Sequence, residues 1–129
     1  MLRNELIIDL NLEQGGNRVS QFQPPMSVWA HYFCVNVYGP LPTFTLTDCK
    51  NGAAPEVRPV VQHDHNWTVE VSDAELPRPA ILRLCKTGVD QYDYWVYRPA
   101  DPEFAYVNWI LDTYPNPLKG TELRRWVII

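Results

Sequence analysis

Hydrophobic and polar residues alternate along much of this chain, in the period of two that is typical of β-strands. The clearest run covers residues 66–71, where Trp67 and Val69 alternate with polar side chains. Residues 6–12 and 43–47 follow the same pattern. Because successive side chains of a strand point to opposite faces of a sheet, each run predicts a strand with one buried face.

Other segments are apolar on both faces. Residues 26–38 place large apolar side chains at odd and even positions alike, which predicts a long central strand that is covered on both sides. The run at 92–98 carries aromatic residues on both of its faces and is also predicted to be a strand. Further strands are predicted at residues 57–61, 81–85 and 123–129.

Proline and glycine separate these runs. Most of the 12 prolines stand in close pairs beside an apolar segment. Proline cannot donate a hydrogen bond to a sheet and breaks helix interiors, so the pairs predict strand ends and loops. Asn51-Gly52 readily adopts the left-handed conformations of a tight turn, which predicts a hairpin into residues 57–61. Residues 86–90 predict a second turn.

One segment has the pattern of a helix. Asp101 is a suitable N-cap and Pro102 fits the first helical position. Apolar residues then recur at helical spacing from Phe104 to Leu111. The sequence therefore predicts one helix late in the chain, over residues 102–113.

Together these elements predict a mainly β fold in one domain that covers residues 1–129. The length suits one domain, and a 46% share of hydrophobic residues is that of a globular protein. We expect a mainly antiparallel β-sandwich or a partly closed β-barrel with about seven or eight strands and one late helix. The strand pattern does not distinguish sandwich from barrel.

The formal net charge of -4 and the isoelectric point near 5.2 bear on the expected partners. Binding to a phosphate backbone or to anionic lipid needs clustered positive charge. The nearest basic cluster is interrupted by acidic residues and consists of Arg98, Lys119, Arg124 and Arg125. Nucleic-acid recognition is therefore disfavoured and stays an alternative, and no membrane contact is expected.

The chain has no apolar stretch of the kind that forms a secretory signal or a membrane span. Its three cysteines, Cys34, Cys49 and Cys85, are odd in number and lack metal-binding spacing. This pattern predicts reduced thiols. We therefore expect a cytoplasmic protein.

His63 and His65 are the strongest candidates for metal chemistry. On a strand their imidazoles would share one face, and Glu70 follows five positions after His65. This spacing resembles the first half of the cupin metal motif, His-x-His followed by Glu after four residues. The flanking glycines of that motif are absent and no histidine follows His65, so a further ligand would have to come from elsewhere, such as His31. We favour an exposed polar loop without a cofactor, and a metal-dependent enzyme that uses His63, His65 and Glu70 is the alternative.

Asp48-Cys49-Lys50 has the Asp-x-Lys spacing of half a nuclease centre, in which a carboxylate holds magnesium and a lysine stabilises developing charge. The upstream acidic partner is missing, since the nearest preceding acid is Glu13. We predict a turn here and an inert thiol at Cys49.

Four aromatic residues stand close together in the strand predicted at residues 92–98. Tyr92 and Tyr94 should share one face, and Trp95 and Tyr97 the other. One pair could remain exposed and bind a partner, because tyrosine and tryptophan combine large contact area with a polar tip. The alternative is that one pair fills the core and the other packs under the helix.

No complete catalytic set is evident in the sequence, so we expect a recognition domain rather than an enzyme. Its predicted role is to bind a protein partner, or a second copy of itself, through an aromatic sheet face or loops. A pocket for a small molecule or sugar is an alternative to this role, as are the metal-dependent enzyme and the DNA- or RNA-recognition module.

Overall fold

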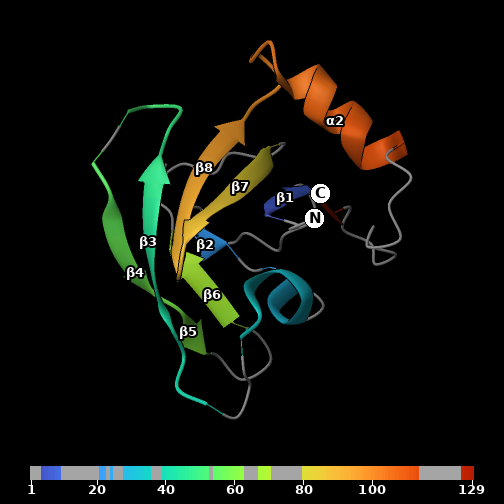
Figure 1. Cartoon of the computed structure of the whole chain (residues 1–129). Helices are drawn as coiled ribbons and strands as arrows, with labels where there is room; N and C mark the ends of the chain where they lie inside the picture. Colours follow the sequence, from blue (N-terminus) through green and yellow to red (C-terminus); the bar gives the residue numbers. More distant parts are fainter. Residues whose placement is uncertain are drawn as a thin grey trace.

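The fold is built from two β-sheets and a late α-helix (Figure 1). The computed structural model describes residues 4–9, 21–22, 24, 28–35, 39–52, 54–62, 67–70, 80–113 and 126–129. The six-stranded sheet contains β1 (Glu5–Asp9), β3 (Thr43–Asp48), β4 (Glu56–Pro59), β7 (Ile81–Gly88), β8 (Gln91–Tyr97) and β9 (Trp126–Ile128). The three-stranded sheet contains β2 (Gln21–Phe22), β5 (Val61–Gln62) and β6 (Trp67–Glu70). The helical elements are η1 (Trp29–Phe33) and α2 (Phe104–Thr113).

The order of strands in the larger sheet is β4-β3-β8-β7-β1-β9. Its neighbouring strands are antiparallel except β3 and β8, which run parallel. The sheet is therefore mixed, and it is not closed into a barrel. The mainly β fold with one late helix is confirmed, and the second sheet makes the arrangement sandwich-like. Strands are present in every segment predicted to form one except residues 26–38.

The central strands of the larger sheet are buried on both faces because their apolar side chains alternate between two cores. The main core lies on the face toward η1 and β6. From the larger sheet it contains Leu6, Ile8, Phe44, Leu46, Leu82, Leu84, Tyr92, Tyr94, Val96, Trp126 and Ile128. The helix-side core lies under α2 and consists of Ile7, Ile81, Tyr97, Val107, Ile110, Leu111 and Val127.

Both predicted turns are present. The first joins β3 to β4 and places Gly52 at φ +69°, a conformation that favours glycine. Asp48, which is buried, stabilises this turn by accepting hydrogen bonds from the backbone N–H groups of Lys50 and Asn51. The second turn is tighter than predicted, because β7 continues to Gly88 and pairs there with Gln91.

The prediction of a long strand over residues 26–38 is wrong. Its described part contains the single π-helical turn η1, which ends at Cys34 in a left-handed conformation with φ 56°. Val28, Trp29, Tyr32 and Phe33 are all buried in the main core. Residues 28 and 32, and likewise 29 and 33, are four positions apart, so all four side chains lie on one side of a helical turn. A continuous apolar run is compatible with such a turn and equally with a strand that is buried on both faces.

Helix α2 begins at Phe104, two residues after the predicted start. The Asp101 carboxylate accepts hydrogen bonds from the backbone N–H of Arg98 and from Lys50, and the Phe104 N–H bonds to the main-chain carbonyl of Asp101. Residues 101–103 therefore form a turn before the helix. No helix within the described part of the chain is both long and apolar enough to cross a membrane.

Lys50 ties the β3–β4 turn to the connection between β8 and α2. Its ammonium group lies 2.6 Å from the Asp101 carboxylate and donates to the Val96 carbonyl at 2.8 Å. The hydrogen bond from Lys50, together with that from the Arg98 backbone, lowers the pKa of the Asp101 carboxyl group. The Asp-x-Lys segment is thus a turn, as predicted, and its lysine has a structural partner.

Leu82→Ala tests whether the main core sets the stability of the domain. Leu82 is fully buried in the centre of the sheet, so the substitution leaves a cavity and should lower the free energy of unfolding by about 3 kcal/mol in chemical denaturation. Val89→Ala is the control because Val89 is 91% exposed, and it should change that free energy by less than about 0.5 kcal/mol. Equal effects of the two substitutions would contradict this arrangement of the core.

Asp101→Asn tests the Lys50 contact through pH. A carboxyl group whose pKa is lower in the folded state stabilises that state above its unfolded pKa of about 3.9, and the effect is lost as the pH falls through the folded value. The variant should therefore melt below the wild type at neutral pH, and the gap should close in acid. Lys50→Met removes the other partner and should show the same trend to a smaller extent, because the Arg98 N–H still lowers the pKa of the Asp101 carboxyl group. Melting curves that stay equally far apart at every pH would refute the contact.

Candidate functional site

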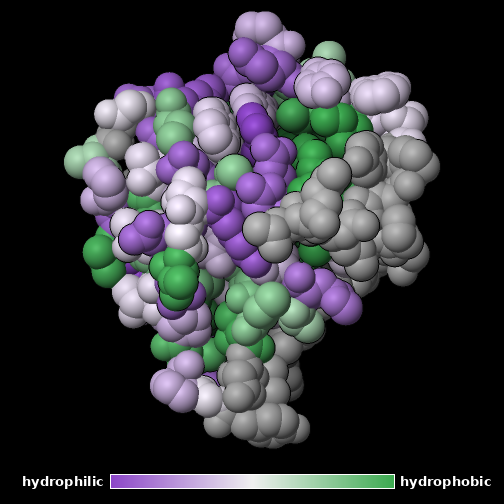
Figure 2. Space-filling model, in the orientation of Figure 1, coloured by the Kyte–Doolittle hydropathy of each residue, from purple (hydrophilic) through white to green (hydrophobic). Residues whose placement is uncertain are grey.

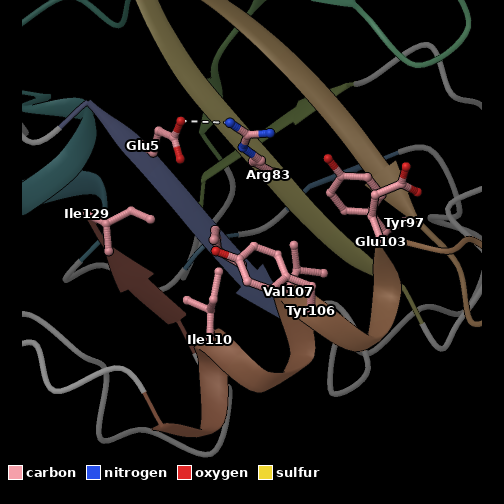
Figure 3. A pocket seen from close by; sticks show the side chains of 9 residues that line it. Glu5, Arg83, Tyr97, Glu103, Tyr106, Val107, Ile110 and Ile129 are labelled. Atoms are coloured by element: carbon pink, nitrogen blue, oxygen red, sulfur yellow. Dashed lines mark hydrogen bonds and ion pairs between the residues drawn. The ribbon is translucent and has the colours of Figure 1, made fainter.

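A cavity of about 350 Å³ lies between α2 and the adjoining face of the larger sheet (Figure 3). It is lined by Glu5, Ile7, Arg83, Tyr97, Glu103, Tyr106, Val107, Ile110 and Ile129. Ligand pockets of proteins range from about 300 to 1,000 Å³, so this cavity has room for a small ligand or a single side chain. Residues from both ends of the described chain meet in it.

The registers of the strands determine the floor of the cavity. Ile7 of β1 lies opposite Arg83 of β7, and Arg83 lies opposite Trp95 of β8. All three residues lie on the face that α2 covers, as Ile7 and Trp95 contact the helix-side core. Arg83 is thus a charged residue in a row of apolar neighbours, and its guanidinium group needs partners on that face.

Arg83 finds those partners in Glu5, Tyr97 and Trp95. One of its Nη atoms lies 2.8 Å from a carboxylate oxygen of Glu5, and its Cζ atom lies 4.5 Å from the centre of the Trp95 ring. The hydrogen bond to Glu5, with a smaller contribution from the neighbouring Tyr97, raises the pKa of the Arg83 guanidinium group above its ordinary value. The arginine is charged at every physiological pH and is fixed in place by acceptors and a ring.

The outer side of α2 carries an exposed aromatic pair beside this cavity. Tyr106 is 64% exposed and Trp109 is 58% exposed, and their rings stack with centroids 6.3 Å apart and planes inclined by 20°. Tyr106 also lines the cavity. In Figure 2 the region around α2, at the upper right, combines apolar surface with pale surface of intermediate hydropathy. We call Tyr106 and Trp109 the α2 aromatic pair.

Two of the four predicted binding residues lie inside the main core. Tyr92 and Tyr94 are 3% and 1% exposed. The Tyr92 ring lies 4.9 Å from that of Phe44 and 5.4 Å from that of Phe33, and burial raises the pKa of its hydroxyl group. Their rings are therefore packing elements of the sheet and are not presented at the surface.

The other two predicted residues lie on the helix side of the sheet. Trp95 is half-buried under the Arg83 guanidinium group, and Tyr97 is buried and lines the cavity. The predicted sharing of faces is confirmed, because the two pairs belong to different cores. Of the four rings, Tyr97 alone lines the cavity.

The described structure contains only part of the candidate metal motif. His63 and His65 lie outside the described residues. Glu70 is the last residue of β6, where it pairs with Gln21, and His31 is exposed on η1. Within the described ranges, no group of three or more His, Cys, Asp or Glu residues is placed to hold a metal ion. Cys34, Cys49 and Cys85 are free thiols.

Sequence reasoning missed Glu5, Arg83 and the α2 aromatic pair. The pair left a signal, because Tyr106 and Trp109 fall outside the apolar stripe that Val107 and Leu111 define on the helix. Large aromatic residues on the polar side of a helix are unusual and mark a surface worth testing. Glu5 and Arg83 left none, since they lie 78 positions apart and meet only through the pairing of β1 with β7.

No family model matches the chain, and no curated protein matches it by sequence. Among solved structures it is similar to the N-terminal domain of Helicobacter pylori LlaJI.R1, with 8% sequence identity and a TM-score of 0.68. The alignment covers 98% of this chain and 97% of that domain. At this level of identity the similarity shows that the two chains share a fold.

Proposed function

We propose that this domain recognises a protein partner through the α2 aromatic pair, and that a side chain of the partner enters the adjacent cavity. The observation that carries the proposal is the stack of Tyr106 and Trp109 on the exposed side of α2. Two large rings in water gain stability when a partner covers them, since burial of apolar area is the main driving force of association.

The chemistry of these residues supports contact with a protein. Tryptophan and tyrosine are enriched among the residues that contribute most to protein interfaces, where they lie next to pockets or clefts. A stacked pair is also ordered before binding, which reduces the entropy lost on association. The cavity beside Tyr106 adds a recess into which one side chain fits.

The charges favour a protein partner over a nucleic acid. Three cations of the described chain already face carboxylates within the domain: the pairs are Lys50–Asp101, Arg58–Glu56 and Arg83–Glu5. A further one, Lys86, lies over the ring of Tyr32. Paired cations release few counterions from a phosphate backbone, and the net charge of -4 opposes its approach.

The solved structure with a similar fold is named as the N-terminal domain of LlaJI.R1. In that protein the fold is therefore one module of a longer chain. A module whose role is to recognise another molecule needs an exposed contact surface and no catalytic centre. The α2 aromatic pair supplies such a surface here.

The test is a selection of peptides that bind the wild-type domain, followed by affinity measurements on the double variant Tyr106→Ala/Trp109→Ala. Removing both rings should weaken peptide binding by about tenfold to a hundredfold, because each deletes a large contact. The circular dichroism spectrum should not change, since both side chains are exposed. Light scattering on the wild type and the double variant identifies a second copy of the chain as partner if only the wild type dimerises.

Val57→Ala is the matched control, because Val57 is also exposed but lies on the edge strand β4. It should leave peptide affinity unchanged. The proposal fails if no sequence is enriched and no dimer forms, or if selected peptides bind the double variant as well as the wild type. Salt-dependent binding of duplex DNA or RNA in place of peptides would assign the domain to nucleic-acid recognition instead.

A further inference from the structure

The cavity beside α2 has a charge balance that bears on what it can bind. Its charged lining residues are Glu5, Arg83 and Glu103, which leaves one excess negative charge. Figure 3 places Glu5 on one side, Tyr97 and Glu103 on the other, and Arg83 between them. The occupant therefore meets carboxylates at both ends of the cavity.

Arg83 is already engaged and is a poor anchor for an incoming anion. It donates a hydrogen bond to one oxygen of Glu5 at 2.8 Å, and its Cζ atom lies over the Trp95 ring, 4.5 Å from the ring centre. An anion would have to compete with Glu5 for the same guanidinium group, and it would be repelled by Glu103.

The carboxylates, in contrast, keep acceptor capacity. Only one oxygen of Glu5 is taken by Arg83, and within the described part of the chain no cation pairs with Glu103. A carboxylate offers about four lone-pair sites, so both groups can accept further hydrogen bonds from a donor. A cationic donor gains more than a neutral one because its hydrogen bonds are charge-assisted.

The rest of the lining suits an aliphatic chain that carries the cation. Ile7, Val107, Ile110 and Ile129 provide apolar contacts, and the exposed ring of Tyr106 lines the same cavity. Long basic side chains bury a methylene stem and leave their charged end at polar groups or over an aromatic face. The volume of about 350 Å³ accommodates one such side chain.

We propose that the cavity binds an arginine or lysine side chain of the protein partner, with its stem against the isoleucines and its charged group at Glu103, the lining carboxylate that no cation of the described chain pairs with. This inference rests on the proposed function and names the chemistry of the residue that the partner inserts. The acidic net charge of the domain favours the approach of a basic segment.

The experiment uses three small probes of equal stem length: N-butylguanidinium, neutral N-butylurea and anionic valerate. Each is titrated into isotope-labelled protein, and NMR shifts of the cavity residues are followed. The guanidinium should bind at least about tenfold more tightly than the urea, because its hydrogen bonds to the carboxylates are charge-assisted. Valerate should not displace it.

Variants then test the sign of the charge. Glu103→Gln should weaken guanidinium binding by about threefold, a modest effect because Glu103 is exposed. Arg83→Gln removes the one cation of the lining and should tighten guanidinium binding several-fold, whereas a site built around Arg83 would lose its ligand. Asp90→Asn is the control: it removes one negative charge at the far end of β8, about 20 Å along the strand from Tyr97, and should change nothing.

The inference is overturned if no probe shifts the cavity residues, if the urea binds as well as the guanidinium, if valerate binds best, or if Arg83→Gln weakens guanidinium binding. These outcomes are separable from failure of the proposed function. If N-butylguanidinium binds saturably but no selected peptide depends on the α2 aromatic pair, the cation site is supported and the protein partner is refuted. If peptide binding depends on the α2 aromatic pair but persists after every arginine and lysine of the peptide is replaced, the protein partner is supported and the cation site is refuted.

Discussion

The structure depends on a sheet that must be buried on both faces. In β1, Leu6 and Ile8 enter the main core while Ile7 enters the helix-side core, and the same alternation recurs in β7, β8 and β9. A sheet of this kind is stable only if each face has a cover, so η1 with β6 and α2 are equally necessary. It also leaves little place for charge: Arg83 is accommodated because Glu5, in the neighbouring strand, compensates it.

Local chemistry made much of the fold predictable. Asn51-Gly52 marked a real turn, and the alternation around Tyr94 assigned the four aromatic side chains of β8 to the correct faces. The failures occurred where two structures bury the same residues equally well. Residues 28–33 satisfy a helical stripe and a two-faced strand alike, so only tertiary contacts decide between them. The parallel pairing of β3 with β8 is likewise invisible in sequence, because it joins segments more than 40 positions apart and both orientations suit the same pattern.

The candidate site was less predictable than the fold because it is assembled from distant elements. The aromatic residues of β8 drew attention as a dense group, yet a strand in the middle of a covered sheet uses its rings for packing, as Tyr92 and Tyr94 do. The aromatic residues that form the candidate site, Tyr106 and Trp109, lie outside the apolar stripe of α2 and are exposed. The number of aromatic residues in a segment did not identify the proposed binding surface, which consists of the two rings that the fold leaves exposed on α2.

The two ends of the described chain lie side by side (Figure 1), and Glu5 and Ile129 exchange backbone hydrogen bonds of 3.1 and 2.9 Å. Both residues line the cavity. A peptide fused through a short flexible linker after Ile129 would start beside the cavity, because Ile129 lines it. The linker would hold the peptide near the cavity at an effective concentration in the millimolar range. Weak ligands could thus be captured in cis as single-chain fusions.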